Sequence, residues 1–226
     1  MFKALLFLVL VLVVFSCGKD ESTYTMNYYE TYHPLETGVY VDYEVVEIQH
    51  DETAIIPHDT SFYYLRTLIS DTVIDNEGRE AYKFIRLVRT DTNEIWEISD
   101  VWTTISDDHR LELTEENRRK VKLIFPPKTY TTWDANVYNS LSPMQCIYEG
   151  IHVPYTIDGL NFDSTIRVEQ DNVLNLVAYR RKYEIYANHV GLVKKHFKDL
   201  VISNFDTLSI SSGSELMYNC IGFGIE

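Results

Sequence analysis

Apolar and polar residues alternate one by one in stretch after stretch of this chain. The pattern is clearest in the segments 39–45, 120–125 and 162–169, where apolar residues fall at alternate positions. A period of two is typical of a strand with one face on a core and the other in water. Further β-rich runs lie at 62–69, 81–89, 95–105, 110–113, 145–151, 183–186, 190–197 and 216–223. The sequence therefore predicts a protein built mainly of half-buried strands.

Turn-forming residues separate many of these runs, as in Asp75-Asn76-Glu77-Gly78 and Asp158-Gly159. Strands joined by tight turns pair antiparallel, because a parallel sheet needs long crossovers that are usually helical. We expect an all-β fold, an antiparallel curved sheet or a barrel or half-barrel of about ten strands. Helices are expected to be short at most, in the segments 174–186 and 126–143.

The N-terminus has the order of a secretory signal. Lys3 precedes an apolar run at 4–15, and the small residue Ser16 precedes Cys17. This arrangement resembles the lipobox of bacterial lipoproteins, which implies acylation of the Cys17 thiol and anchoring to a membrane through the acyl chains. The alternative is an ordinary signal peptide with a chance cysteine. Lys19, Asp20 and Glu21 resemble the surface-export signal of lipoproteins in the Bacteroidota, although a solvated tether has a similar composition.

These features divide the chain into a signal peptide at 1–16, an acylated tether at 17–30 and one β-rich domain at 31–226. Without the signal, 210 residues remain, which suits a single domain. A formal net charge of −14 argues against general binding to nucleic acids, because such binding requires positive charge to displace counterions.

Three segments carry a further resemblance. They are Tyr32-His33-Pro34-Leu35 followed by Gly38, the aromatic-rich stretch 133–139, and the stretch Tyr-Ala-Asn-His-Val-Gly-Leu-Val-Lys at 186–194. Together they resemble recurring elements of a family of small Bacteroidota lipoproteins. The resemblance implies an outer-membrane location facing the cell exterior and a β-rich fold, and it implies no reaction.

Residues with catalytic chemistry do not form a recognisable motif in the sequence. It lacks a Gly-x-Ser-x-Gly elbow and phosphate-binding glycine patterns, and the seven histidines show no metal-ligand spacing, so neither a cofactor nor a metal is expected. Cys146 and Cys220 remain after Cys17, and they either form a disulfide or stay as two buried thiols. A pair of carboxylates from distant strands remains the one hydrolytic arrangement open to the chain.

Aromatic residues are better candidates for binding. Trp96 and Trp102 have the same parity along one expected strand and so are predicted to share a face, where they either line a hollow or pack as ordinary core. Trp133 is a third candidate. We therefore expect a lipid-anchored, non-catalytic binding or assembly module for a hydrophobic, glycan or protein ligand; the alternative is a cell-envelope hydrolase acting on glycan or lipid.

The lipobox generates the first testable prediction. Radiolabelled palmitate fed to expressing cells should enter the wild-type protein and be absent from the Cys17→Ala variant, because the thiol is the acylated group. Gel fluorography measures the label. Label that persists in the variant would refute acylation at Cys17.

Overall fold

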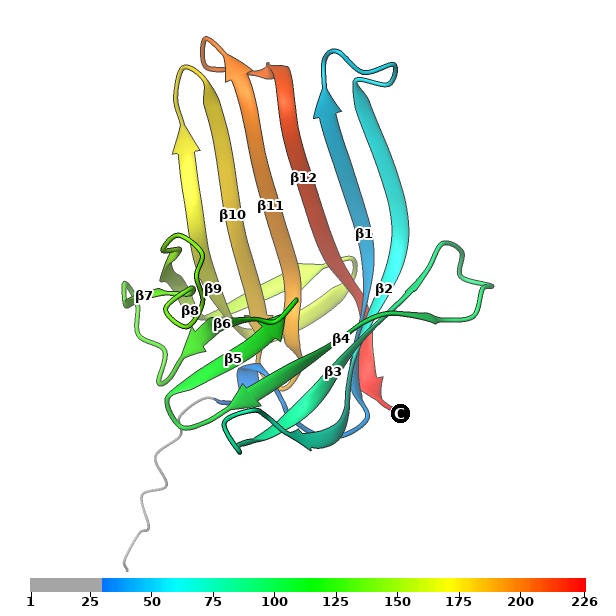
Figure 1. Ribbon diagram of the computed structural model, residues 1–226, viewed down its shortest axis with the longest axis vertical. Coiled ribbons are helices and arrows are strands. Elements are labelled where there is room, and N and C mark those ends of the chain that lie inside the picture. The colour runs from blue at the N-terminus through cyan, green and yellow to red at the C-terminus, as the bar shows by residue number, and fades with distance from the viewer. Residues whose placement is uncertain (1–29) are drawn as a thin grey trace, which may run out of the picture.

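Twelve strands and one short 3-10 helix make up the part of the chain that the structure, a computed structural model, describes (Figure 1). This part is residues 30–226; the signal segment 1–16, Cys17, Lys19, Asp20 and Glu21 lie outside it. The expected all-β fold is confirmed, with twelve strands in place of about ten. The elements are η2 (Glu30–Tyr32), β1 (Val39–Asp51), β2 (His58–Ile74), β3 (Glu80–Arg89), β4 (Glu97–Ser106), β5 (Arg110–Glu115), β6 (Arg118–Ile124), β7 (Thr132–Asp134), β8 (Gln145–Ile157), β9 (Leu160–Leu174), β10 (Ala178–Ala187), β11 (Gly191–Ser203) and β12 (Asp206–Ile225).

All the strands belong to one antiparallel sheet with the order β6-β5-β4-β3-β2-β1-β12-β11-β10-β9-β8-β7. Every pair of neighbours is consecutive in the chain except β1 and β12, which join its two ends at the centre of the sheet. The fold is thus two meanders of six strands, paired along their first and last strands. Tight turns produce this topology, because each one returns the chain beside the strand it has just left.

The lower half of the sheet curls until its two edges nearly meet. Val121 of β6 donates its backbone N–H to the carbonyl oxygen of Ala135, just after β7, at 2.9 Å. The indole nitrogen of Trp133 donates to the carbonyl oxygen of Val121 at 3.0 Å, and the hydroxyl of Tyr148 on β8 accepts the N–H of Ile124 at 2.9 Å. These bonds bring the edges together as a nearly closed barrel.

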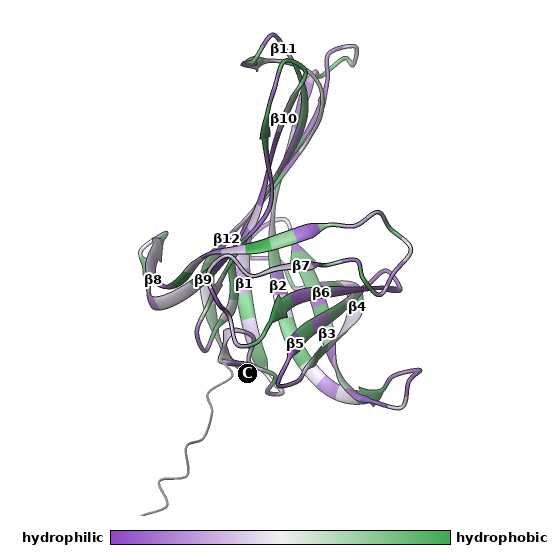
Figure 2. Cartoon of the chain, turned by 90° about the vertical axis from the view of Figure 1, so that its left-hand side faces the viewer, coloured by the Kyte–Doolittle hydropathy of each residue, from purple (hydrophilic) through white to green (hydrophobic). Residues whose placement is uncertain are grey.

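The upper half of the sheet remains a single layer. β3 pairs with β2 only from Tyr64 downward, and β8 pairs with β9 only up to Glu169. Beyond these points six strands continue alone, through residues 46–51, 58–63, 170–174, 178–182, 197–203 and 206–217. We call this layer the fin; Figure 2 shows it edge-on as a thin blade above the barrel.

Two apolar clusters fill the barrel. One lies between η2 and strands β5 to β10 and contains Tyr32, Leu123, Trp133 and Tyr148. The other lies under β1, β2 and β9 to β12 and contains Val45 and Leu65. Tyr32 is fully buried, and its hydroxyl lies 2.8 Å from both His152 Nδ1 and Ser164 Oγ. The short helix η2 therefore acts as a plug for the lower end of the barrel.

Two sequence expectations about the fold are wrong. The segment 174–186 is not helical but forms the β9–β10 turn and most of β10, and the segment 126–143 contains turns and the short strand β7. The apolar spacing of 174–186 is ambiguous because both faces of β10 are partly covered, so the alternation that marks a half-buried strand is blurred.

The two cysteines of the barrel are both free. Cys146 on β8 is buried in the first cluster and Cys220 on β12 in the second. Strands β9, β10 and β11 separate β8 from β12 in the sheet, so the disulfide alternative would require strands that are not neighbours. The structure has two buried thiols instead.

This arrangement predicts the outcome of an alkylation experiment. The Cys17→Ser variant, denatured without reductant and treated with iodoacetamide, should gain two alkyl groups by mass spectrometry, because both remaining thiols become accessible on unfolding. A chain that gains none would carry the disulfide and would contradict the strand order.

Candidate functional site

A small cavity lies inside the barrel above the plug. It has a volume of about 50 Å³, and its walls come from all parts of the sheet. His33, directly after η2, forms the floor, while Phe84, Trp102 and Tyr218 form part of the walls. The rings of Phe84 and Trp102 stack at a centroid distance of 6.3 Å. The cavity is therefore lined by aromatic rings but has room for only a few water molecules.

Charged groups line the same cavity, and most of them are paired. Lys122 Nζ lies 2.7 Å from Glu184 Oε1 and 3.9 Å from Glu115 Oε1, and the hydroxyl of Tyr186 donates to Glu184 at 2.7 Å. Burial alone would raise the pKa of each carboxyl. The lysines reverse this effect: Lys122 holds the pKa of Glu184 below its ordinary value, and Lys122 with Lys120 lowers the pKa of Glu115 to about 2. Both carboxylates are thus ionised at neutral pH.

Lys195 of β11 is the lysine in this wall without an ion-pair partner within 4 Å among the described residues. Its ammonium lies 5.2 Å from the centroid of the Tyr218 ring, a cation–π contact. Burial lowers the pKa of Lys195, and the more distant Glu184 partly opposes this effect. A charged group in this position favours water in the cavity over an apolar ligand.

Arg86 of β3 separates the cavity from the space above it. Its guanidinium donates to Asp100 Oδ2 at 2.6 Å and to the Tyr218 hydroxyl at 3.1 Å. The same group lies 4.5 Å from the centroid of the Trp102 ring. Arg86 therefore caps the cavity with three contacts and belongs at the same time to the groove above.

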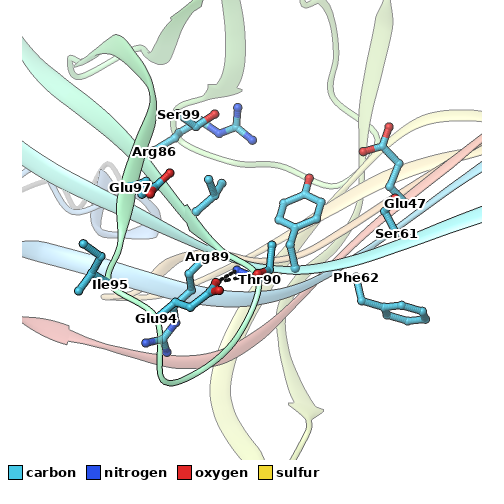
Figure 3. A pocket seen from close by; sticks show the side chains of 12 residues that line it. Glu47, Ser61, Phe62, Arg86, Arg89, Thr90, Glu94, Ile95, Glu97 and Ser99 are labelled. Carbon is cyan, nitrogen blue, oxygen red and sulfur yellow. Dashed lines mark hydrogen bonds between the residues drawn. The ribbon is translucent and has the colours of Figure 1, made fainter.

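That groove is the largest concavity of the described residues, with a volume of about 950 Å³ (Figure 3). It lies where β2 enters the fin while the β3–β4 hairpin turns away from it. One wall carries Glu47, Ser61 and Tyr63, and the other carries residues of the hairpin, Arg89, Ile95 and Glu97 among them. In Figure 3 the side chains of Glu47 and Phe62 point to opposite sides of the sheet.

The groove runs along an unpaired strand edge. Residues 58–63 of β2 pair with β1 on one side only, since β3 begins its pairing at Tyr64. Asp51 donates its N–H to the carbonyl oxygen of Pro57 at 3.0 Å. Because ladder bonds alternate along an antiparallel pair, His58, Thr60 and Phe62 then direct their N–H and C=O groups away from β1. These backbone groups form a free edge beside the groove.

The three tryptophans occupy different environments. β4 contains a bulge, so that Arg86 and Leu87 of β3 lie opposite Asp100 and Ile98 and the residue between them has no partner. The extra residue reverses the parity of the strand. Trp102 therefore faces the cavity, whereas Trp96 packs on the outer face under the guanidinium groups of Arg66 and Arg89, at 5.1 and 4.2 Å. The prediction of a shared face is wrong.

Trp133 is a core residue and lines neither the cavity nor the groove. Its ring lies 4.7 Å from that of Tyr148, and it is 9% exposed. The basic clusters of the second half of the chain also have structural roles, because six of their ten cations form ion pairs, namely Arg119, Lys120, Lys122, Arg180, Lys182 and Lys198. This is the arrangement of a solvent-facing charge ladder.

Two of the segments that carry the family resemblance meet below the cavity. His189 has a φ of 61° and donates its N–H to the carbonyl oxygen of Thr31 at 2.7 Å. Gly191 has a φ of 104°, and a Cβ there would lie 3.7 Å from His33 Nδ1. The turn after β10 therefore fixes the plug. The chain matches no known family model, no curated protein and no solved structure.

Two further features of residues 30–226 bear on the site. Among them, no group of three or more His, Cys, Asp or Glu side chains is arranged to hold a metal ion. None of the helical segments in that range is long and apolar enough to cross a membrane.

The environment of His33 predicts a pH dependence of stability. Burial, followed by the charge of Lys122, lowers the pKa of His33 to about 4 from an ordinary 6.5. As the pH falls below 6.5, the unfolded chain takes up a proton that the folded chain refuses, so the free energy of unfolding should fall until about pH 4. A shift of this size corresponds to about 3 kcal/mol.

Urea unfolding at several pH values measures this loss. His33→Phe should reduce the fall between pH 6.5 and 4, whereas the same change at the exposed His109 should leave it as in the wild type. Identical pH profiles for His33→Phe and the wild type would contradict the assignment.

Proposed function

We propose that this chain is a lipid-anchored lipoprotein of the outer membrane, displayed at the cell surface, and that it is a non-catalytic binding module. Its partner is an extended polypeptide segment that adds to the free edge of β2 within the groove. The observation that carries the proposal is the run of outward backbone groups at His58, Thr60 and Phe62 beside a groove of about 950 Å³.

Unpaired strand edges are templates for another strand, and soluble proteins usually block them with lysine, proline, bulges or covering segments. Within residues 58–63 there is neither lysine nor proline, and Phe62 is 66% exposed on this edge. A second edge lies at 170–174 of β9, but no described element forms an opposite wall there. The β2 edge offers a strand main-chain bonds on one side and hairpin side chains on the other.

The charges of the groove favour a basic segment. Glu47 and Glu97 form no ion pair within 4 Å, whereas Arg86 is neutralised by Asp100. A lysine or arginine of the partner would meet these carboxylates at the rim of the groove, where such contacts contribute more to specificity and association rate than to affinity.

The interior carboxylates do not support the hydrolase alternative. Glycoside hydrolysis needs one carboxyl group that is protonated near neutral pH and can act as the acid. In this cavity, Lys122 and its neighbours lower the pKa of both Glu115 and Glu184. The pair therefore supports a structural role in the barrel wall.

Proline at position 60 tests the proposed edge pairing. Octapeptides selected from a random phage-displayed library on the wild-type protein should bind Thr60→Pro at least about tenfold more weakly, since proline removes an outward N–H. The ladder with β1 does not use this N–H, so the fold should persist.

Thr60→Val is the matched control, because it removes the hydroxyl and keeps the backbone donor. It should bind the selected peptides like the wild type in fluorescence polarisation. Failure to select any peptide, or equal binding by Thr60→Pro, would refute edge addition.

A further inference from the structure

Three hairpin turns lie side by side along the top of the fin. They connect β1 with β2, β9 with β10, and β11 with β12 (Figure 1). Backbone bonds fix them as neighbours: Glu52 donates to the carbonyl oxygen of Ser211 at 2.9 Å, and Ile202 donates to that of Val177 at 3.0 Å. The turns therefore form one continuous edge of the molecule.

Each turn presents two large apolar side chains to solvent. We call these six residues the apolar rim: Ile55, Ile56, Leu176, Val177, Phe205 and Leu208. All are more than half exposed, and the exposed fractions of Ile55 and Leu208 are 102% and 88%. A single exposed isoleucine needs no explanation, but six on adjacent turns mark a contact surface.

The charge around the rim is of one sign. The segments 51–59, 174–178 and 203–208 contain Asp51, Glu52, Asp59 and Asp206 but no lysine or arginine. Asp51 accepts the N–H of Thr53 at 2.9 Å and Asp206 that of Leu208 at 2.9 Å, so both carboxylates also stabilise their turns. The acidic rim disfavours a second copy of itself and an anionic surface alike.

The shape of the rim also restricts its partner. The fin is one sheet thick, so its apolar side chains project from a narrow convex edge (Figure 2). A protein partner would have to present a matched slot for three separate turns. The headgroup and acyl boundary of a bilayer accepts such projections without a preformed pocket, and the outer ammonium groups of zwitterionic lipids suit neighbouring carboxylates.

We infer that the apolar rim is a membrane-contact surface that inserts into the interfacial region of a zwitterionic bilayer. The six side chains enter the boundary between headgroups and acyl chains, and the carboxylates remain at headgroup level. This contact lies at the end of the molecule opposite η2 (Figure 1), and it does not depend on the proposed binding at the β2 edge.

Vesicle co-sedimentation tests the inference. The protein is the chain from residue 17 onward with Cys17→Ser, because residues 30–226 contain every strand and both core clusters of the fold and no acyl chain then confounds binding. The probes are phosphatidylcholine vesicles and vesicles of equal parts phosphatidylcholine and phosphatidylglycerol. The rim variant is Ile55→Ser with Leu208→Ser. The matched control is Ile74→Ser with Ile98→Ser, at two positions that are 70% and 63% exposed away from the rim.

We expect the parent protein and the control to bind phosphatidylcholine vesicles equally, and the rim variant to bind at least about tenfold more weakly. Phosphatidylglycerol should weaken binding at low salt, and added salt should restore it. Absence of binding by the parent, equal binding by the rim variant, or a requirement for anionic lipid would each overturn the inference. A rim-dependent dimer in analytical ultracentrifugation without vesicle binding would instead assign the rim to a second copy. Circular dichroism confirms that each variant is folded.

Discussion

The contact between β6 and β7 determines what the rest of this sheet can do. The bond from Val121 to Ala135 and the bond from Trp133 to Val121 join strands that stand at opposite ends of the strand order. Without that contact, the sheet would be an open layer, and the two apolar clusters would have nothing to pack against. With it, one face of the lower sheet becomes an interior that excludes water, and Trp133 supplies both a ring for the core and a donor for the closure.

The fin shows the consequence of the opposite situation. Its six strands have no second layer, so cross-strand pairs hold them: the rings of Tyr183 and His196 stack at 5.0 Å, and Lys198 pairs with Glu215 at 2.8 Å. Exposed ion pairs contribute little free energy each. The fin therefore depends on hairpin ladders that are continuous with the barrel, above all on β1 and β12, which run through both parts. Its turns should open at a lower free-energy cost than the strands around Tyr43 and Leu65.

The sequence predicts local structure here better than it predicts which side of the sheet a residue faces. Alternation at 39–45 correctly indicates a strand with Val41, Tyr43 and Val45 inside. The same alternation continues into the fin, where no second layer covers either face, so periodicity cannot mark where the barrel ends. Trp96 and Trp102 fail for another reason: a bulge in β4 shifts the register by one residue, and nothing in that stretch announces it. The free edge of β2 follows from which strands stop pairing, a property of the assembled sheet. The apolar rim did leave a signal, because Ile55-Ile56 and Leu176-Val177 interrupt otherwise polar turns.

The interior chemistry explains why binding is proposed on the outside of this barrel. A carrier of an apolar ligand needs a dry hollow of several hundred cubic ångströms. This barrel instead contains Lys122, Glu184 and Glu115 in contact and a further ammonium at Lys195, around a space of about 50 Å³. Removing one partner of a buried pair leaves an uncompensated charge, which destabilises a fold far more than the pair itself stabilises it. The wall is therefore constrained to keep its charges, and enlarging the cavity would expose them to a ligand they disfavour. The surfaces free of this constraint are the edge of β2 and the turns of the fin, because there the unsatisfied groups face solvent and a partner can cover them without disturbing the core.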